Sequence, residues 1–338
     1  MTVYLIVFAG ALVLAIGVTP AARWLAPHVG MMDQPAPRKI HLKPVPRIGG
    51  VAIYLAVIVA ALVLGEWRNF HEFGAILVGA TGVSFMGLVD DRWGLRPLVK
   101  MIGQALAALL LYTSGIYVSL FRHPLLNLLA TVLWVGYITN AINFLDNMDG
   151  LAGGVSAIAA AFFALMCSFS GQYLVGALAI AVLGACLGFL FYNLNPASIF
   201  MGDSGALFLG FVLAAIGIKL RFPDNVSFVT WMVPVLVMGL PIFDTTLVII
   251  SRLRRGLNPA TTPGKDHISH RLVAAGLTRR EAVLTLYVVA FIMGLLATFV
   301  TRASVIEGYI VGGITLLAGI YALWRVERPP FFRREGTE

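Results

Sequence analysis

Long apolar runs, separated by short polar stretches, dominate this chain of 338 residues. A membrane-spanning helix needs roughly 20 mostly apolar residues, and runs of this kind recur throughout the sequence. They predict an all-α polytopic membrane protein with about 10–11 transmembrane helices. The candidate spans are residues 2–23, 48–65, 73–89, 98–114, 124–139, 151–170, 173–191, 205–220, 228–250, 282–301 and 305–324.

Polar residues are concentrated in four short patches, and each patch falls at the same end of a neighbouring span. Carboxylates, amides and histidines are costly to keep beside hydrocarbon, so such residues indicate a functional site by default. Because the four patches converge on one face of the membrane, we expect them to form one site. The patches are Asp90 to Arg92, Asn140 to Gly150, Asn195 to Gly205 and Asp266 to Leu272.

Composition limits the domain organisation. Hydrophobic residues make up 59% of the chain and charged residues 12%, against about 25% charged in soluble domains. We expect one integral-membrane domain over residues 1–324 and a charged tail at 325–338. The first span lacks a basic leader and a small-residue cleavage site, which predicts a retained helix. Cys167 and Cys186 lie inside spans and suggest neither a disulfide framework nor a metal site.

The placement of the basic residues predicts the orientation of the chain. The net charge is +8, and an N-terminus on the outside puts most Lys and Arg in inside segments, as the positive-inside rule requires. We therefore expect a multi-pass protein of the cytoplasmic (plasma or inner) membrane, with its C-terminus and polar patches facing the cytoplasm. A basic excess there suits anionic lipid or an anionic substrate, not nucleic acid. Of 24 Lys and Arg, the outside segments keep Arg68, Arg122, Lys219, Arg221 and Arg302.

Asp90 and Asp91 are adjacent carboxylates at the predicted membrane boundary. Like charges this close repel each other unless a cation joins them. A divalent metal, a phosphate acid or Arg92 would each use that situation. Solvated acids at a helix C-terminus are the alternative, but acids there oppose the helix dipole. We therefore favour a functional role.

The second patch carries five polar residues at helical spacing. Asn140, Asn143 and Asn147 share a helix face, and Asp146 and Asp149 lie approximately on the face of Asn143. Hard oxygen ligands of this kind suit Mg²⁺, which prefers one or two carboxylates plus substrate phosphates. The alternative is a cluster of helix caps, for which five polar residues in ten positions would be excessive.

The third and fourth patches contain potential phosphate donors. Asn195 and Asp203 bracket an inside turn, and the helix that starts near Gly205 offers backbone N–H groups to a phosphate; simple capping of that helix is the alternative. His267 and His270 are three apart, so a helix would place them on one side. Two imidazoles without a third soft ligand make a poor zinc set. Phosphate binding by imidazole, Lys and Arg fits better.

For three further residues, the sequence does not decide between a functional role and a purely structural or topological one. Lys43 and Arg47 precede a flexible Gly49-Gly50 turn into the second span, where charge topology alone would explain them. Asp244 lies just inside the cytoplasmic end of its span, and a buried acid there needs a hydroxyl or a ligand as partner.

Taken in order, the motifs resemble a known family. DDR, NAINFLDNMDGLAGG, NPASIFMGDSG, PIFDT and a basic histidine-bearing loop are similar to those of the polyprenyl-phosphate N-acetylhexosamine-1-phosphate transferases, over about Arg38 to Leu272. PVPRIGG and DNMDGL look more like the members that start cell-envelope glycans than like the muramoyl-pentapeptide branch. One departure is Ser269, where relatives commonly carry a histidine in a His-x-His-His motif; it puts the sugar preference in doubt.

The resemblance implies transfer of a HexNAc-1-phosphate, most simply GlcNAc-1-phosphate, from a UDP-sugar to undecaprenyl (polyprenyl) phosphate, with release of UMP. It implies Mg²⁺, with Mn²⁺ as an alternative ion, and leaves a homodimer open. The implied metal ligands are Asn143 and Asp203. The implied catalytic residues are Asp90, Asp91, Asp146 and Asp149. The implied substrate-binding residues are Lys43, Arg47, Asn140, Asn147, Asn195, His267, His270 and Arg271.

Alternative functions remain within and outside this enzyme class. The phospho-MurNAc-pentapeptide transferase of peptidoglycan synthesis is the nearest one. An ion-coupled transporter would also carry intramembrane acids, but transporter sites lie near the bilayer midplane, and here the middle of each predicted span is almost free of charge. A non-catalytic scaffold of a glycan-export complex would not need the acidic set.

Overall fold

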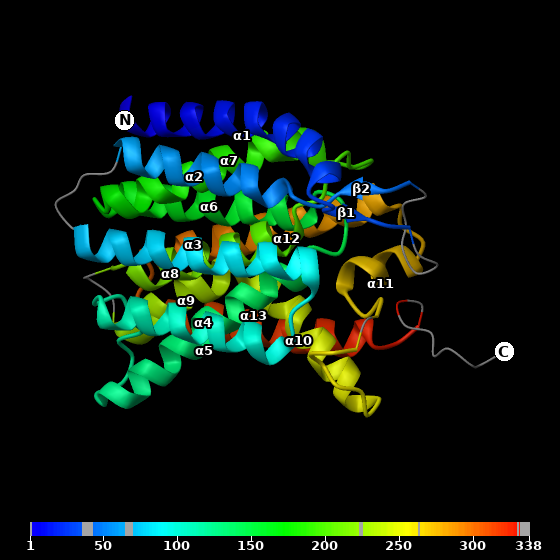
Figure 1. Ribbon diagram of the computed structural model, residues 1–338. Coiled ribbons are helices and arrows are strands. Elements are labelled where there is room, and N and C mark those ends of the chain that lie inside the picture. The colour runs from blue at the N-terminus through cyan, green and yellow to red at the C-terminus, as the bar shows by residue number, and fades with distance from the viewer. Residues whose placement is uncertain are drawn as a thin grey trace.

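The computed structural model describes residues 2–35, 43–64, 70–222, 226–262, 264–329 and 331. Within these residues the chain is almost entirely helical, with one antiparallel pair of short strands (Figure 1). The elements are α1 (Thr2–His28), β1 (Met32–Asp33), β2 (Val45–Pro46), α2 (Gly49–Leu64), α3 (Phe70–Trp93), α4 (Pro97–Thr113), α5 (Pro124–Leu145), α6 (Leu151–Phe169), α7 (Tyr173–Asn193), α8 (Gly202–Lys219), α9 (Ser227–Val237), α10 (Gly239–Arg254), α11 (Ile268–Ala274), α12 (Arg279–Val300) and α13 (Val305–Val326).

The predicted all-α membrane architecture is confirmed, and each predicted span contains a helix. Among the described residues, eight helices are long and apolar enough to cross a membrane, and α2 and α4 are shorter apolar helices. The predicted span at 228–250 corresponds to the pair α9 and α10, which is bent by 75°. Pro234 lies inside α9, and Gly239 begins α10 directly after the break. Proline lacks an N–H and disrupts a continuing helix, which accounts for a bend in this region.

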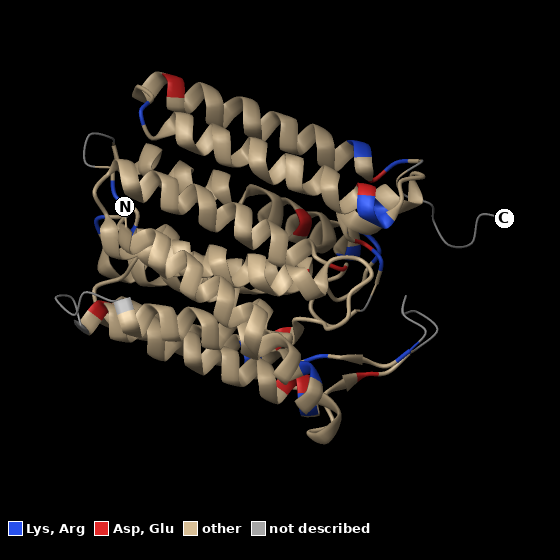
Figure 2. Ribbon diagram, turned by 90° about the horizontal axis from the view of Figure 1, so that it is seen from above, with Lys and Arg blue, Asp and Glu red and all other residues tan. Residues whose placement is uncertain are grey.

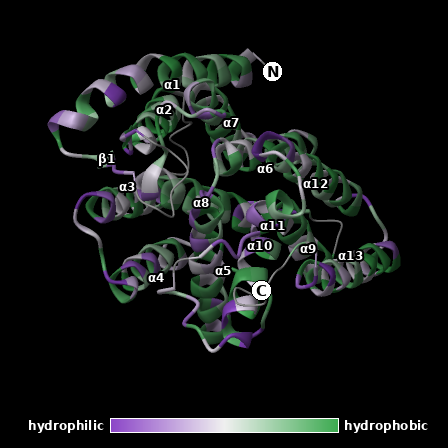
Figure 3. Cartoon of the chain, turned by 90° about the vertical axis from the view of Figure 1, so that its right-hand side faces the viewer, coloured by the Kyte–Doolittle hydropathy of each residue, from purple (hydrophilic) through white to green (hydrophobic). Residues whose placement is uncertain are grey.

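Helix α8 is the central element of the bundle. It packs against α2, α3 and α5, and its residues are buried from Gly202 to Ile218. In the end-on view of Figure 3 the other helices surround it. By contrast, α13 lies at the periphery, where Ile314 and Leu317 are exposed, as expected of a lipid-facing helix.

Charged residues gather at the ends of the bundle, most densely at the end that carries the β1–β2 pair (Figure 2). This end, which we call the polar end, holds the last turns of α3, α5, α7 and α10, the first turns of α4, α6 and α8, and the short helix α11 (Figure 1). At the opposite end, Lys219 Nζ of α8 donates to Glu72 Oε2 of α3 over 2.6 Å. Helices α3 and α8 therefore have polar contacts at both ends.

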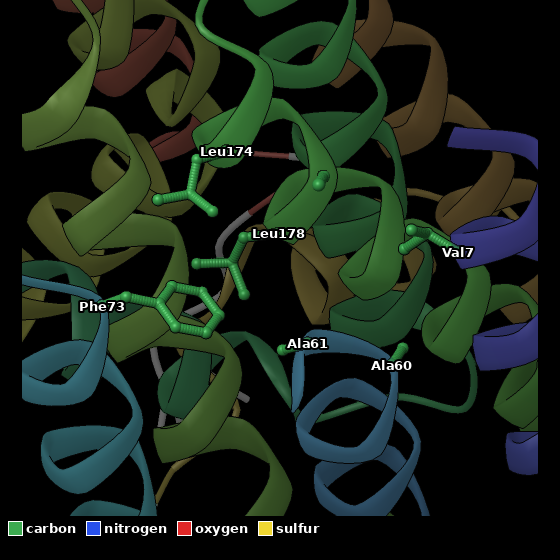
Figure 4. A pocket seen from close by; sticks show the side chains of 7 residues that line it. Val7, Ala60, Ala61, Phe73, Leu174 and Leu178 are labelled. Atoms are coloured by element: carbon green, nitrogen blue, oxygen red, sulfur yellow. The ribbon is translucent and has the colours of Figure 1, made fainter. Parts of the chain in front are cut away.

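A small apolar cavity lies far from the polar end. Val7, Ala60, Phe73 and Leu178, from α1, α2, α3 and α7, line it (Figure 4). Its volume of about 10 Å³ is at the lower limit for one water molecule, and a water needs polar partners that these side chains do not offer. The cavity is therefore a packing defect and not a ligand site.

Candidate active site

The centre of the polar end is the contact between the last turn of α3 and the first turn of α8. Asp91 Oδ1 accepts from the backbone N–H of Asp203 over 2.9 Å, and Asp91 Oδ2 accepts from that of Ser204 over 3.0 Å. Two glycines permit this contact. A Cβ at Gly87 would lie 2.5 Å from the Asp203 backbone, and Gly202 has a φ of 73°, which a residue with a Cβ rarely adopts. Asp91 therefore caps α8 from a neighbouring helix.

This contact changes the expected role of the α8 N-terminus. We expected its N–H groups to face a phosphate, but two of them already donate to the Asp91 carboxylate. The Asp91 side chain is 0% exposed. Asp91 therefore holds the Asp203 loop in place and has little surface to offer a substrate.

Arg47 directly follows β2, and it reaches this centre because the backbone on both sides of it is hydrogen-bonded to Phe200, just before α8. Phe200 N–H donates to the Pro46 carbonyl, and the N–H of Gly49 donates back to the Phe200 carbonyl. Arg47 then contacts two carboxylates, Asp91 at 3.0 Å and Asp203 at 2.8 Å. Burial lowers the pKa of Arg47, whereas these carboxylates raise it, and the net shift is upward. Its side chain is 37% exposed, so the guanidinium can also face a ligand.

Lys100 provides a second cation in the same cluster. It lies in the first turn of α4 and donates from Nζ to Asp90 Oδ2 over 2.7 Å and to Asp203 Oδ2 over 2.9 Å. The Leu95 N–H donates to the other oxygen of Asp90. Asp203 thus lies between Arg47 and Lys100, and the two cations compensate only part of the negative charge of the three acids. We call Arg47, Asp90, Asp91, Lys100 and Asp203 the carboxylate cluster.

The loop between α5 and α6 brings two more acids to this end. Burial raises the pKa of Asp146 to about 7, Arg47 opposes the shift, and Asp203 and Asp91 add to it. Asp146 is therefore electrostatically coupled to the carboxylate cluster. Asp149 instead accepts from Asn195 Nδ2 at 2.8 Å and from the Ala197 N–H at 3.1 Å. Asp149 and Asn195 therefore fasten the α5–α6 loop to the α7–α8 loop.

The histidine helix α11 is held by buried side chains of other elements. His267 Nδ1 lies 2.8 Å from Asp244 Oδ2 of α10, and the His267 ring meets Phe144 edge to face. Ser269, fully buried, donates to Asn147 Oδ1 over 2.5 Å. Ser269 thus joins α11 to the α5–α6 loop.

The predicted phosphate-binding residues His270 and Arg271 lie in different environments. Burial lowers the pKa of His270 to about 4, and His267 lowers it further, so the ring is neutral at pH 7. Arg271 is 2% exposed. It donates to the carbonyls of Asp266 and Val326 and to Ser251 Oγ, and it lies 2.7 Å from Glu327. In this arrangement Arg271 joins α11 to α10 and to the end of α13.

Three predicted residues lie apart from these contacts or at their edge. Asn140 pairs with Gln104 of α4 at 2.6 Å and donates to the Gly136 carbonyl, deeper in the bundle. Asn143 is half-buried in the last turn of α5. Lys43 is exposed just before β2. The sequence motif around Lys43 begins in residues 36–42, which lie outside the described residues.

Lys100 has no role predicted from the sequence, and the sequence leaves the role of Asp244 open. A single lysine at the start of a span fits the positive-inside rule equally well, so Lys100 carried no separate signal. Asn193 was also missed. It accepts from the Gly150 N–H at 3.1 Å and donates to the Ile199 carbonyl at 2.9 Å. Its position two residues before the Asn195-Pro196 motif was the available hint.

The donor set suits Mg²⁺ by its chemistry. Mg²⁺ takes hard oxygen ligands and commonly uses one or two carboxylates, with waters and substrate phosphates completing the shell. Asp203 and Asn143 offer such oxygens. Within the described ranges, no group of three or more His, Cys, Asp or Glu side chains could hold a metal by itself.

Comparison with known proteins defines the family. Residues 73–221 match the model of glycosyl transferase family 4. The chain is 38% identical over 297 residues to a probable undecaprenyl-phosphate N-acetylglucosaminyl 1-phosphate transferase of Bacillus subtilis, covering 85% of this chain and 82% of the relative. It is 34% identical over 305 residues to the decaprenyl-phosphate N-acetylglucosaminephosphotransferase of Mycobacterium tuberculosis, covering 80% and 75%. An Escherichia coli undecaprenyl-phosphate alpha-N-acetylglucosaminyl 1-phosphate transferase is 26% identical over 332 residues, covering 91% and 88%.

The chain therefore belongs to glycosyl transferase family 4, and the resemblance inferred from its motifs is confirmed.

Proposed function

We propose that this protein transfers N-acetylglucosamine 1-phosphate from UDP-GlcNAc to a polyprenyl phosphate, at the cytoplasmic face of the plasma or inner membrane. The observation that carries the proposal is the carboxylate cluster, in which two cations and three acids meet at one end of a membrane bundle. The named relatives act on undecaprenyl or decaprenyl phosphate, which supports the choice of acceptor.

The reaction is a phosphoryl transfer. An oxygen of the polyprenyl phosphate forms a bond to the β-phosphorus of the UDP-sugar, the bond from this phosphorus to the bridging oxygen breaks, and UMP leaves. Such reactions depend mainly on positioning and on neutralisation of charge. Arg47 and Lys100 provide positive charge beside Asp203. Each of these side chains could exchange one carboxylate partner for a phosphate oxygen of the substrate.

Asp203 and Asn143 are the residues that would hold Mg²⁺. When bound, the ion would neutralise negative charge on the diphosphate. The charges of the carboxylate cluster affect the pKa of Asp146. We assign Asp146 to supporting the ligand shell of the metal. Asp90, the less buried of the adjacent acids, is assigned to the lipid phosphate. Asp149 and Asn195 shape the loops that border the nucleotide site.

The first test is UMP release by purified protein given polyprenyl phosphate, UDP-GlcNAc and Mg²⁺. Release that requires the lipid, and that EDTA abolishes, supports the proposal. Parallel reactions with UDP-GalNAc and UDP-MurNAc-pentapeptide decide the donor. No release with any donor, from folded protein, would overturn the enzyme assignment and favour a transporter or scaffold.

A variant pair tests the metal assignment. Asp203→Ala should lower turnover by at least about 100-fold, whereas Glu307→Gln, at the far end in the exposed first turn of α13, should not. A wild-type rate for Asp203→Ala would remove the metal assignment. The membrane side is tested separately by a topology reporter fused after α13, which should be cytoplasmic; an external reporter would contradict the proposed orientation.

A further inference from the structure

Asp244 is a buried acid that the proposed reaction does not use. It lies in α10, five residues after the break from α9, and is 0% exposed. Both of its oxygens contact the start of α11: Oδ2 lies 2.8 Å from His267 Nδ1, and Oδ1 accepts from the Ile268 N–H over 2.7 Å. A buried carboxylate needs such partners, because burying a charge without them is costly.

We infer that Asp244 is a positioning residue that sets the tautomer and orientation of His267. An ionised carboxylate only accepts hydrogen bonds, so the proton of a neutral His267 ring belongs on Nδ1. The lone pair of a neutral ring is then on Nε2 and is available to a substrate hydroxyl or amide. The inference rests on the proposed function only for the identity of the group that Nε2 contacts.

The packing around His267 supports a fixed ring. Phe144, from the last turn of α5, meets His267 with an interplanar angle of 82° and a centroid separation of 6.1 Å. The His270 ring, in the first turn of α11, lies 6.2 Å from the His267 ring. His267 itself is 7% exposed. The orientation of the ring is therefore set from α10 and α5 together.

A purely structural role would also place an acid at this position, because Asp244 caps α11 through Ile268. The substitution Asp244→Asn separates the two roles. The amide oxygen can keep the bond from the Ile268 N–H, while the amide NH₂ faces Nδ1 and donates to it. The proton of His267 must then move to Nε2, with almost no change of side-chain volume.

The test combines a spectroscopic and a kinetic readout on the full-length protein. Nitrogen NMR of protein labelled with ¹⁵N-histidine reports which ring nitrogen carries the proton, and His267→Gln assigns the signal. We expect protonated Nδ1 in the wild type and protonated Nε2 in Asp244→Asn. Turnover should fall by at least about 10-fold, the scale known for loss of a group that orients a metal-ligating histidine.

A double-mutant comparison tests whether the effect passes through His267. In the His267→Gln background, Asp244→Asn should lower turnover no further. Ser251→Ala is the matched structural control, since it removes a buried contact of α10 with α11 through Arg271 without touching His267. It should lower the unfolding temperature and leave both turnover and tautomer unchanged.

Two results would overturn the inference: an unprotonated Nδ1 in the neutral wild-type ring, or wild-type turnover in Asp244→Asn. If the wild type releases no UMP, the proposed function fails, and the NMR comparison alone decides the role of Asp244. The two failures are therefore distinguishable.

Discussion

Lys100 Nζ lies 2.9 Å from Asp203 Oδ2, although the two residues are 103 positions apart in the chain. This contact joins the start of α4 to the start of the central helix α8. It also means that the acid assigned to Mg²⁺ already has a cation partner.

Removal of the Lys100 charge should separate catalysis from metal binding. In Lys100→Met we expect turnover to fall by at least about 100-fold, because charge stabilisation of the transferring phosphoryl group is lost. The Mg²⁺ concentration for half-maximal rate should also fall, since a competing cation has left Asp203. Titration of UMP release with Mg²⁺ measures both effects, and Lys100→Arg, which keeps the charge, is the control. A higher Mg²⁺ requirement in Lys100→Met would contradict this view.

Asp91 should matter for stability as well as for rate. Asp91→Ala leaves two backbone N–H groups at the α8 N-terminus without their acceptors, and each buried group left unpaired costs about 1–3 kcal/mol. Asp91→Asn retains one acceptor oxygen and should be less destabilised. Thermal unfolding in detergent should therefore rank wild type above Asp91→Asn and Asp91→Ala last. Equal unfolding temperatures for the two variants would show that Asp91 does not cap α8.

Asp146 should give the protein a pH dependence near neutrality. Its pKa rises from 3.8 to about 7 in the folded protein. Between these values the folded state binds a proton that the unfolded state has lost. The contribution of this group to stability is therefore complete below about pH 4 and is lost as the pH rises through about 7. Unfolding curves at several pH values measure it, and Asp146→Asn should remove this component.

The activity should show the opposite trend with pH. If the ionised form of Asp146 supports the metal shell, turnover rises through a midpoint near 7 at low Mg²⁺, and the midpoint moves to lower pH as Mg²⁺ is raised. Asp146→Asn should lack this rise. If the turnover of Asp146→Asn still rises with pH through the same midpoint, the titrating group is not Asp146.

Arg271 should behave as a structural residue. Arg271→Ala leaves the carbonyls of Asp266 and Val326 without this donor and, among the described residues, leaves Glu327 with only the longer contact to Arg254, at 3.6 Å; breaking a buried pair from one side costs about 3–5 kcal/mol. We expect a large loss of thermal stability. Ser251→Ala, which removes one of these contacts, should lose much less. A stable Arg271→Ala protein whose KM for the UDP-sugar alone is raised would instead support direct substrate binding.

The sequence analysis predicted the helices well because apolar runs of spanning length have few alternatives in a membrane protein. It also singled out Asp90, Asp91 and Asp203 as candidates, since acids at a membrane boundary are costly and therefore informative, and the structure brings these three acids into one cluster. It could not show that Asp91 occupies the α8 N-terminus, because that contact depends on how closely α3 approaches α8 at Gly87. The pairing of Asp244 with His267 depends on the 75° bend between α9 and α10, which a hydropathy pattern does not reveal.

The contacts at the two ends of α3 and α8 have a consequence for motion. Asp91 holds the first turn of α8, and Glu72 holds its last residue, Lys219. Sliding one of these helices past the other along the membrane normal would break contacts on both sides of the bilayer at once. The acids of α3 and α8 therefore keep a constant relative depth as lipids enter and leave. Entry of a long-chain acceptor therefore does not involve sliding of α3 against α8 as long as these contacts persist.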